Sequence, residues 1–368
     1  MKQKIAIGMS GGVDSSVSAL LLKEAGFDVS GFFMKFWSDN SCDSKRENSC
    51  CNAESIKMAG KVAQNIGIPF YVVDVQKLFK EIVVDDFIKE YADLRTPNPC
   101  VGCNKFIKFG WFMELARNAG FDKIATGHYV RIEKDEAGTF HLLSGEDATK
   151  DQSYFLHRLN QEQLSNIVFP VGGMIKKDVM EIAKKNGMDF ENKKESQEVC
   201  FVQDKNYKDF LARHLKSEYF SSGSVIDRDG KIVGKHDGLI GYTIGQRKGI
   251  EYSGIKNDNR EPLYVAGFDK EKNNLIVGTE KDIYSKSFLI GNVSWISESA
   301  KKAAFGSKDL KVKIRYRHTA VACSVEYDKG DESKIRVALN VPQKAVTPGQ
   351  YAVFYAGNEV LGGGVIGG

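Results

Sequence analysis

A segment rich in glycine and serine near the N-terminus has the composition of a phosphate-binding loop. It reads Gly8-Met9-Ser10-Gly11-Gly12-Val13-Asp14-Ser15-Ser16 and lies between a strand-like stretch, 4–9, and a helix-like stretch, 14–25. Adjacent glycines let backbone N–H groups approach a phosphate, serine hydroxyls add hydrogen bonds, and the start of a helix favours an anion. We expect an ATP site here; the structural alternative is a tight turn capped by serine.

The loop lacks the lysine of the large nucleoside triphosphatase class, since no Gly-Lys pair in the chain is followed by Ser or Thr. Without a lysine that reaches the β and γ phosphates, the loop suits pyrophosphate, and cleavage between the α and β phosphates, better. Asp14 could help to hold Mg²⁺ beside the pyrophosphate, or could instead cap the following helix.

Two cysteine segments predict sulfur chemistry. The first reads Arg95-Thr96-Pro97-Asn98-Pro99-Cys100-Val101-Gly102-Cys103, and the second reads Ser196-Gln197-Glu198-Val199-Cys200. The two prolines predict an extended loop that presents the cysteines ahead of a helix over 104–118. A thiol near a helix N-terminus has a lowered pKa, so we expect Cys103 to be reactive. Burial as a small apolar side chain is the alternative.

The remaining cysteines carry weaker signals. Cys42, Cys50 and Cys51 share a polar stretch, but they lack the two separated ligand pairs of a zinc site, and no histidine is near. We expect a structural or incidental role for them. Cys323 lies in a predicted strand, where packing is the simplest role.

A basic segment near the C-terminus is a candidate RNA contact. Over 310–316 and just beyond, a strand period of two places Lys311, Lys313, Arg315 and Arg317 on one face. Such a face can bind phosphates, and Tyr316 offers a stacking surface; an ordinary solvated face is the alternative. His128 could contact an extruded base, or could be an ordinary hydrogen-bonded histidine.

Strands and helices alternate through the first two hundred residues. We expect strands at 4–9, 29–34, 70–75 and 123–126, and helices at 14–25, 53–65, 79–91 and 104–118. This alternation predicts a parallel sheet covered by helices. Ligands of such sheets bind beyond the carboxyl ends of the strands, which places the loops after Gly8, Met34 and Thr126 together.

From about residue 221 the pattern changes to short β-branched and aromatic runs. Asp229-Gly230 between two such runs predicts a hairpin, and 310–316, 334–341 and 350–355 are further predicted strands. We expect an α/β domain with the candidate ATP site at 1–208, a small central β domain at 209–282 and a C-terminal β-barrel at 283–368 that carries the candidate RNA contact.

Composition places the chain among soluble globular proteins. Its 368 residues carry a net charge of only +4, so nucleic-acid affinity must come from local patches. No apolar run approaches the roughly 20 residues of a bilayer-spanning helix. The N-terminus shows no signal-peptide pattern, and seven cysteines is an odd number. We therefore expect a cytoplasmic protein without a membrane partner.

The loop Ser10-Gly11-Gly12-Val13-Asp14-Ser15 resembles the ATP-pyrophosphatase loop superfamily, whose members activate a carbonyl oxygen as an adenylate and then displace AMP. Together with the cysteine segments, the chain resembles the tRNA-specific 2-thiouridylases over nearly its full length. Further matching segments are Met34-Lys35, Thr126-Gly127-His128-Tyr129, Lys150-Asp151-Gln152-Ser153-Tyr154-Phe155, Gly245-Gln246-Arg247-Lys248-Gly249, Thr347-Pro348-Gly349-Gln350 and Leu361-Gly362-Gly363-Gly364.

This resemblance implies an adenine nucleotide α hydrolase-like N-terminal fold and a reaction. ATP adenylates the C2 oxygen of the wobble uridine, sulfur attacks C2, and AMP leaves. Cys103 is the implied nucleophile, and Cys200 the implied carrier of a persulfide received from a sulfur-relay protein or a cysteine desulfurase. The implied substrates are the Lys, Glu and Gln isoacceptors of tRNA.

The resemblance also implies binding residues. Those for ATP are Gly8, Met9, Ser10, Gly11, Gly12, Val13, Asp14, Ser15, Met34 and Gly127. Those for tRNA are Asn98, Pro99, Cys100, His128, Lys150, Asp151, Gln152, Arg315, Tyr316 and Gln350.

The chain departs from the family pattern at Cys100, where Asp is common. The role of that Asp as a general acid or base is therefore in doubt. Cys100 could be an auxiliary thiol, or Cys100, Cys103 and Cys200 could hold an iron–sulfur cluster. Two other classes remain open: an adenylating amide ligase, and a tRNA-binding module with a spent nucleotide site, against which the intact loop argues.

Overall fold

The N-terminal region is built on a sheet of five parallel strands, as the alternating pattern predicted. In the computed structural model, which describes residues 2–39, 53–188, 190, 199–202, 206–251 and 261–367, the strand order is β3-β2-β1-β4-β7. The strands are β1 (Lys4–Gly8), β2 (Asp28–Lys35), β3 (Phe70–Asp74), β4 (Lys123–Ala125) and β7 (Ile167–Val168). The carboxyl ends of β1, β2 and β4 are therefore neighbours, and the loops after them meet at one edge.

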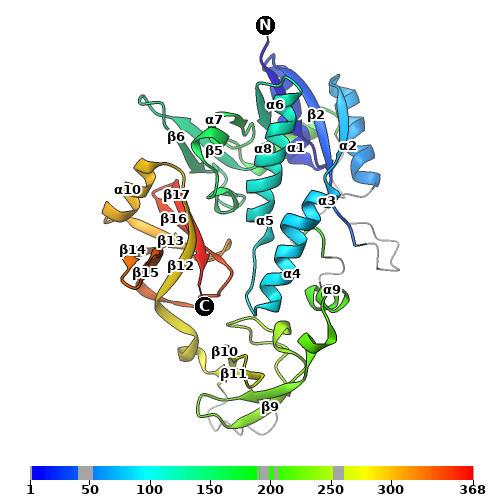
Figure 1. Ribbon diagram of the computed structural model, residues 1–368. Helices are drawn as coiled ribbons and strands as arrows, with labels where there is room; N and C mark the ends of the chain where they lie inside the picture. Colours follow the sequence, from blue (N-terminus) through cyan, green and yellow to red (C-terminus); the bar gives the residue numbers. More distant parts are fainter. Residues whose placement is uncertain are drawn as a thin grey trace.

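Helices cover both faces of this sheet (Figure 1). Ile5 and Ile7 point to the core beneath α1 (Val13–Glu24), α2 (Ala53–Ile66) and α8 (Lys176–Lys185), whereas Ala6 points to the opposite core. Two long helical segments cover that opposite face. One joins α3 (Gln76–Phe79), a π-helical turn (Lys80–Val84) and α4 (Asp85–Ala92); the other joins α5 (Pro99–Gly102), a π-helical stretch (Cys103–Trp111) and α6 (Phe112–Asn118).

The second of these segments, which we call the cysteine helix, begins at Pro99 and not at 104 as predicted. Proline is well tolerated at the first helical position, because its fixed φ suits a helix and the N–H it lacks would have no helical partner. Asn98 before it is extended, at φ −119° and ψ 91°. The expectation of cysteines in a loop ahead of the helix is thus wrong: Cys100 and Cys103 lie inside its first turns.

The central region is a four-stranded sheet in the order β10-β11-β8-β9. The predicted hairpin is confirmed: β8 (Gly223–Ile226) pairs antiparallel with β9 (Ile232–His236) across a turn in which Gly230 has φ 82°. The other two strands are β10 (Tyr264–Asp269) and β11 (Asn274–Gly278). Helix α9 (Tyr207–His214) and short 3-10 turns at 217–220, 239–241 and 280–283 complete the elements described there.

The C-terminal region is a closed barrel of six strands, also as predicted. Its order is β12-β15-β14-β13-β16-β17, and β12 pairs back onto β17. The strands are β12 (Tyr284–Trp295), β13 (Leu310–Lys313), β14 (Val321–Asp328), β15 (Asp331–Lys344), β16 (Tyr351–Ala356) and β17 (Glu359–Ile366), with α10 (Glu298–Gly306) after β12. A Cβ at Gly362 would lie 2.3 Å from the Ser294 carbonyl oxygen, so closure requires glycine there.

One barrel strand is shorter than its sequence predicted. β13 ends at Lys313, and residues 314–318 form a turn. Exposure still alternates, because Lys311, Arg315 and Arg317 are exposed whereas Ile314 is buried. The prediction of one continuous cationic strand face is therefore wrong: Lys311, Arg315 and Arg317 face solvent, whereas Lys313 is half-buried and paired with Asp151.

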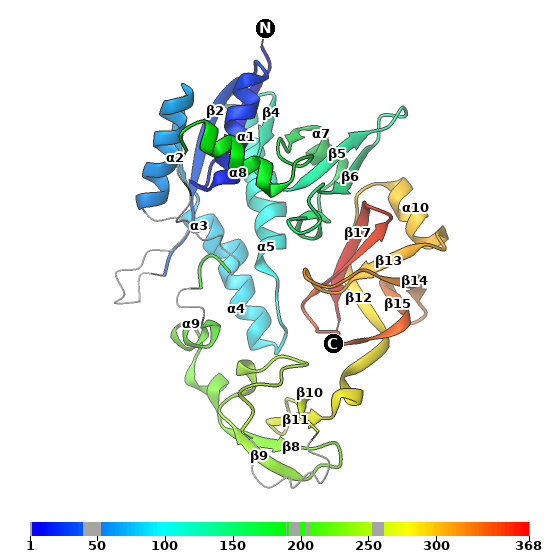
Figure 2. The ribbon, with the colours of Figure 1, turned by 180° about the vertical axis from the view of Figure 1, so that it is seen from behind.

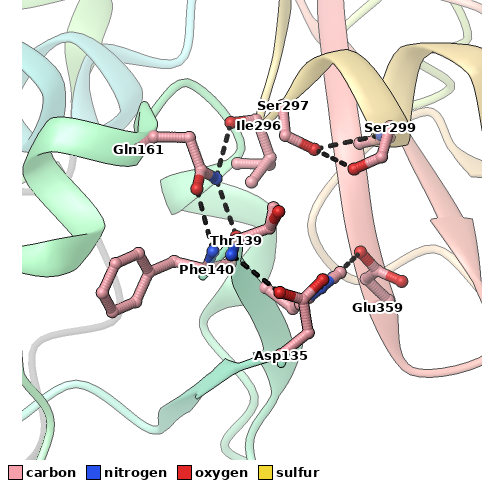
Figure 3. A network of polar contacts seen from close by, with 10 residues as sticks. Asp135, Thr139, Phe140, Gln161, Ile296, Ser297, Ser299 and Glu359 are labelled. Atoms are coloured by element: carbon pink, nitrogen blue, oxygen red, sulfur yellow. Dashed lines mark hydrogen bonds and ion pairs between the residues drawn. The ribbon is translucent and has the colours of Figure 1, made fainter. Parts of the chain in front are cut away.

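A hairpin that the sequence did not reveal joins the N-terminal region to the barrel. β5 (Val130–Lys134) and β6 (Phe140–Ser144) pair with each other, and β6 pairs with β17 through Leu143 and Glu359. Figure 3 shows the polar contacts around this junction: Glu359 reaches His141 Nδ1 at 2.7 Å, and Gln161 of α7 (Gln161–Ser165) donates to the Ile296 carbonyl at 3.1 Å. These contacts hold the barrel against the N-terminal region.

Among the helices that the structure describes, none combines the length and the apolar character needed to cross a bilayer.

Candidate active site

The glycine- and serine-rich loop folds as a tight turn from β1 into α1. Gly12 is the N-cap of α1 and has no side chain to cap the helix, and Ser15 Oγ accepts the Ser10 N–H at 3.2 Å. Gly11 has φ +71°, and a Cβ there would lie 2.4 Å from the Ser55 carbonyl oxygen of α2. Only glycine fits that position. The turn thereby brings its backbone to the start of a helix, where an anion is favoured.

Met34 and Gly127, which were predicted to bind ATP together with this loop, lie against it. A Cβ on Gly8 would lie 3.3 Å from Met34 Cε of β2, and a Cβ on Gly127 would lie 2.6 Å from the backbone nitrogen of Ser15. The structure therefore brings together the predicted ATP residues of β1, α1, β2 and the loop after β4. Their role in binding ATP stays a prediction, because geometry alone places no nucleotide.

Asp14 is held by two partners that the sequence did not reveal. Its Oδ1 accepts a hydrogen bond from the Tyr129 hydroxyl at 2.6 Å and lies 2.7 Å from Lys176 Nζ at the start of α8. Asp14 makes no side-chain cap of α1, so the capping alternative is wrong. Lys176 lies 162 residues further along the chain, and nothing in the local pattern of either segment signals their contact.

A single carboxylate at the loop is compatible with Mg²⁺, which commonly binds one or two carboxylates together with substrate phosphates. The described residues contain no group of three or more His, Cys, Asp or Glu side chains arranged to hold a metal ion. Asp14 could therefore bind Mg²⁺ only jointly with phosphate oxygens.

His128 lies between the loop and the cysteine helix. Its Nδ1 is 2.7 Å from Thr126 Oγ1, and its ring centroid is 5.6 Å from that of Phe109. Burial and, secondarily, the charge of Lys108 hold the pKa of His128 well below its usual value. The imidazole is therefore neutral at physiological pH and suits a hydrogen bond better than a phosphate contact.

The cysteine helix presents two thiols in different surroundings. Cys100 is exposed, whereas Cys103 is 6% exposed and packs in the apolar core on the opposite face of the sheet from α1. Cys200 is half-buried and packs against the same core, and the next residue, Phe201, has ring contacts with Phe79, Phe87 and Phe210. Phe201 thus anchors the Cys200 segment to the helices over that face of the sheet.

The described structure gives no support to the iron–sulfur alternative, which stays a prediction. Cys100, Cys103 and Cys200 all belong to the described residues, among which no metal-holding group occurs. Cys42, Cys50 and Cys51 lie outside the described residues. Cys323 is a buried core residue of β14, as expected, and burial raises its pKa to about 12.

Two of the predicted tRNA contacts place the barrel beside the cysteine helix. The Tyr316 ring lies 4.4 Å, between centroids, from Phe155, whose carbonyl accepts from Asn104 Nδ2 at 3.3 Å, directly after Cys103. Gln350 Nε2 donates to the Thr96 carbonyl at 2.8 Å, before the helix. The short segment that carries Asn98, Pro99, Cys100 and Cys103 therefore has barrel contacts at both ends. The contact before it is direct, through Gln350, and the contact after it is indirect, through Phe155.

The other predicted tRNA residues have defined partners. Asp151 is buried and accepts from Gly145, Ser153 and, at 3.4 Å, from Lys313 Nζ of β13, so it joins the barrel to the N-terminal region. Gln152 Oε1 accepts the Tyr129 N–H at 3.0 Å. Lys150 is half-buried, and Arg315 is exposed with one donor directed at the Lys344 carbonyl at 3.3 Å. Their contacts with tRNA stay predictions.

Three family models match successive parts of the chain. Residues 3–204 match a tRNA methyl transferase HUP domain, residues 208–279 a tRNA methyl transferase PRC-barrel domain, and residues 285–366 an aminomethyltransferase beta-barrel domain. The first match alone spans more than half of the chain.

Full-length relatives carry one common name. A tRNA-specific 2-thiouridylase MnmA from Geobacter metallireducens is 44% identical over 99% of this chain and 97% of the relative. A second from Enterococcus faecalis is 44% identical over 99% and 95%, and a third from Caldanaerobacter subterraneus subsp. tengcongensis is 44% identical over 100% and 98%. Each of these relatives is matched over at least 95% of its own length, so the similarity spans all three parts of this chain.

Proposed function

We propose that this chain, which belongs to the tRNA-specific 2-thiouridylase family, uses ATP to replace the C2 oxygen of the wobble uridine of tRNA with sulfur. The observation that carries the proposal is the full-length similarity to 2-thiouridylases. The adjacency of a phosphate-type loop and a cysteine helix supports it, because the two halves of the reaction need both. Neither an amide ligase nor a non-catalytic RNA-binding module needs both.

In the first half-reaction, the loop from Gly8 to Ser15 binds ATP. Backbone N–H groups at the start of α1 receive the phosphates, and Met34 and Gly127 border the nucleotide. Asp14, together with phosphate oxygens, would hold Mg²⁺, whose charge would offset the negative charge of the pyrophosphate. The uridine C2 oxygen attacks the α phosphorus, pyrophosphate leaves, and the adenylate makes the C2 oxygen a good leaving group.

In the second half-reaction, Cys200 carries a persulfide whose terminal sulfur attacks C2, and AMP departs with the former C2 oxygen. The Cys103 thiolate then attacks the sulfur of Cys200. This step forms a Cys103–Cys200 disulfide, breaks the persulfide bond and releases 2-thiouridine. The two cysteines supply the two electrons that reduce the sulfane sulfur, and a cellular thiol must reduce the disulfide afterwards. The persulfide itself comes from a sulfur-relay protein or a cysteine desulfurase.

Cys100 is exposed at the second position of the cysteine helix, where the pattern of the family commonly has Asp. We propose an auxiliary role for this thiol beside the target base. No step of this proposal passes through an iron–sulfur cluster.

We propose that tRNA lies against the barrel and the cysteine helix. Asn98, Pro99 and Cys100 then flank the extruded uridine, while Arg315 and Tyr316 contact the backbone and a base. His128, Lys150, Asp151, Gln152 and Gln350 complete the proposed tRNA set. The proposed substrates are the Lys, Glu and Gln isoacceptors, and the proposed location is the cytoplasm. Domain limits at 208/209 and 282/283 complete this proposal.

The experiment is thiolation of unmodified tRNA by the wild type and by Cys103→Ser, Cys200→Ser and Cys323→Ala, each loaded by a cysteine desulfurase. Cys103→Ser and Cys200→Ser should lose thiolation and keep tRNA affinity within about twofold, because each removes one sulfur atom and little binding surface. Cys323→Ala is the matched control, a cysteine buried in the barrel. Retained turnover in Cys103→Ser or Cys200→Ser would contradict the persulfide route.

A further inference from the structure

Residues 93–98, here called the strap, connect the end of α4 to the start of the cysteine helix. The strap runs between α4 and the barrel and passes close to the C-terminus, as both views of the ribbon show (Figures 1 and 2). It contains no regular secondary structure, and Leu94 has a φ of 60°. Its conformation must therefore be set by contacts with its neighbours.

The barrel binds the strap through main-chain and side-chain contacts. The Thr96 N–H donates to the Pro348 carbonyl at 2.8 Å, and Gln350 Nε2 returns a bond to the Thr96 carbonyl at 2.8 Å. Gly349, at φ +90°, allows this approach, because a Cβ there would lie 2.8 Å from the Thr96 nitrogen. The turn between β15 and β16 thus binds both the N–H and the carbonyl of Thr96.

The other two regions hold the strap as well. Leu94 packs against the apolar core of the central region, and Thr96 Oγ1 is 3.4 Å from Thr243 Oγ1 of that region. On the catalytic side, Arg95 Nε donates to Glu90 Oε2 of α4 at 2.8 Å in a half-buried ion pair. All three regions therefore meet on six residues that lead directly into the cysteine helix.

Arg95 contacts two of these regions through one side chain. While Nε binds Glu90 of α4, Nη2 points at the Ile366 carbonyl of β17 at 3.4 Å. The guanidinium can hold two acceptors in one plane, which an ammonium on a flexible stem cannot do. Arg95 thereby ties the last strand of the barrel to α4, only eight residues before Cys103.

We propose that Arg95 is a positioning residue for Cys103. The first turn of a helix has few internal hydrogen bonds, so its order depends on how firmly the chain entering it is held. Arg95, by fixing the strap between α4 and β17, keeps Cys103 buried at a defined place beside the core. Its loss lets the first turns of the cysteine helix open, which displaces the thiol from the line of attack on the Cys200 persulfide.

The effect of Arg95 on the rate of thiolation rests on the proposed function, but its effect on the burial of Cys103 does not. Three variants test it: Arg95→Ala, Arg95→Lys, and Arg117→Ala as the matched control. Arg117 forms a 3.0 Å ion pair with Glu162 at the far end of the same helix, in an exposed place away from the strap. The first readout is the rate of alkylation of each cysteine by N-ethylmaleimide in the full-length protein, followed by peptide mass spectrometry.

Three cysteines in the chain make this readout specific. Cys103 is buried, so its labelling reports opening of the helix start; Cys100 is already exposed and serves as the reference; Cys323 is buried in the barrel and reports global unfolding. Arg95→Ala should raise the labelling of Cys103 relative to Cys100 by about tenfold with Cys323 unchanged. Arg95→Lys should fall between, and Arg117→Ala should match the wild type. Equal labelling of Cys103 in Arg95→Ala and the wild type would overturn the proposal.

The second readout is single-turnover thiolation of tRNA by desulfurase-loaded protein, with tRNA affinity measured alongside. A displaced thiol should lower the thiolation rate of Arg95→Ala by about 100-fold, with tRNA-dependent pyrophosphate release and tRNA affinity within about threefold of the wild type. Weaker tRNA binding with an unchanged rate would make Arg95 a binding residue instead. A wild type that does not thiolate tRNA would refute the proposed function, and the labelling ratio would still decide the positioning role.

Discussion

Gly127 offers a sharp test of the nucleotide loop, because it touches the loop without belonging to it. A Cβ at this position would lie 2.6 Å from the Asp14 carbonyl carbon and from the Ser15 nitrogen, both backbone atoms of the first turn of α1. Ordinary contact begins near 3.4 Å, so Gly127→Ala must move the helix start by about 0.8 Å. The φ of Gly127 is not in the left-handed region, so the effect is one of space and not of backbone strain.

A shift of this size should disturb catalysis more than folding. Displacing reacting groups by about 1 Å can lower a rate by about 100-fold, and overpacking costs about 1–3 kcal/mol of stability. We therefore expect kcat/KM for ATP to fall by about 100-fold in Gly127→Ala, with tRNA affinity nearly unchanged. The control is Gly173→Ala, since Gly173 is exposed, has no atom within 4 Å of its would-be Cβ and has no left-handed φ.

The assay is tRNA-dependent release of pyrophosphate as a function of ATP concentration, together with the melting temperature of each variant. Wild-type kinetics in Gly127→Ala at an unchanged melting temperature would refute the reasoning, because the loop could then not be the place where ATP reacts.

Three further outcomes are expected. Tyr129→Phe removes one of the two donors to Asp14 and should raise KM for ATP by about tenfold. An unchanged KM would show that this hydrogen bond does not contribute to ATP binding. Hydrogen bonding to Glu359 raises the pKa of His141 above its usual value, so this pair stabilises the fold fully at low pH and less as pH rises through the raised pKa. The difference in melting temperature between the wild type and Glu359→Gln should therefore be larger at about pH 6 than at about pH 9. A difference that stays constant with pH would contradict this. Arg315→Ala should lower the slope of log Kd for tRNA against log salt concentration by about 1. An unchanged slope would mean that Arg315 does not contact a tRNA phosphate.

The parts of this fold that have a local sequence pattern could be predicted from the sequence. The alternation of strands and helices fixed the parallel sheet, and so placed the loops after Gly8, Met34 and Thr126 at one edge. The glycines of the nucleotide loop were recognisable because close backbone approach leaves no other residue type possible, as at Gly11 against Ser55. The barrel was predicted from short strands separated by turn residues.

Contacts between distant segments were not recoverable in the same way. The ion pair between Asp14 and Lys176 joins segments 162 residues apart, and neither segment is unusual in composition. The strap gave no signal of its contacts with the barrel either, because Thr96 is held through its main chain. Gln350 was predicted as a tRNA contact from resemblance alone, and its amide donates to the strap in this structure.

Two local predictions were wrong for local reasons. The helix expected at 104 begins at Pro99, since proline is tolerated at a helix start as well as in an extended loop. The strand expected over 310–316 ends at Lys313, because alternating exposure can continue through a turn. In both cases one sequence pattern is compatible with two backbone conformations, and packing decides which of them forms.

The central claim is that the chain converts a tRNA uridine into 2-thiouridine at the expense of ATP. The most direct measurement digests tRNA to nucleosides after incubation with ATP, Mg²⁺, the protein and a desulfurase with cysteine, and quantifies 2-thiouridine, AMP and pyrophosphate together. We expect one AMP and one pyrophosphate for each 2-thiouridine, and no thiolation when ATP is omitted. Thiolation without ATP, or AMP and pyrophosphate formed without 2-thiouridine by protein carrying the persulfide, would contradict it.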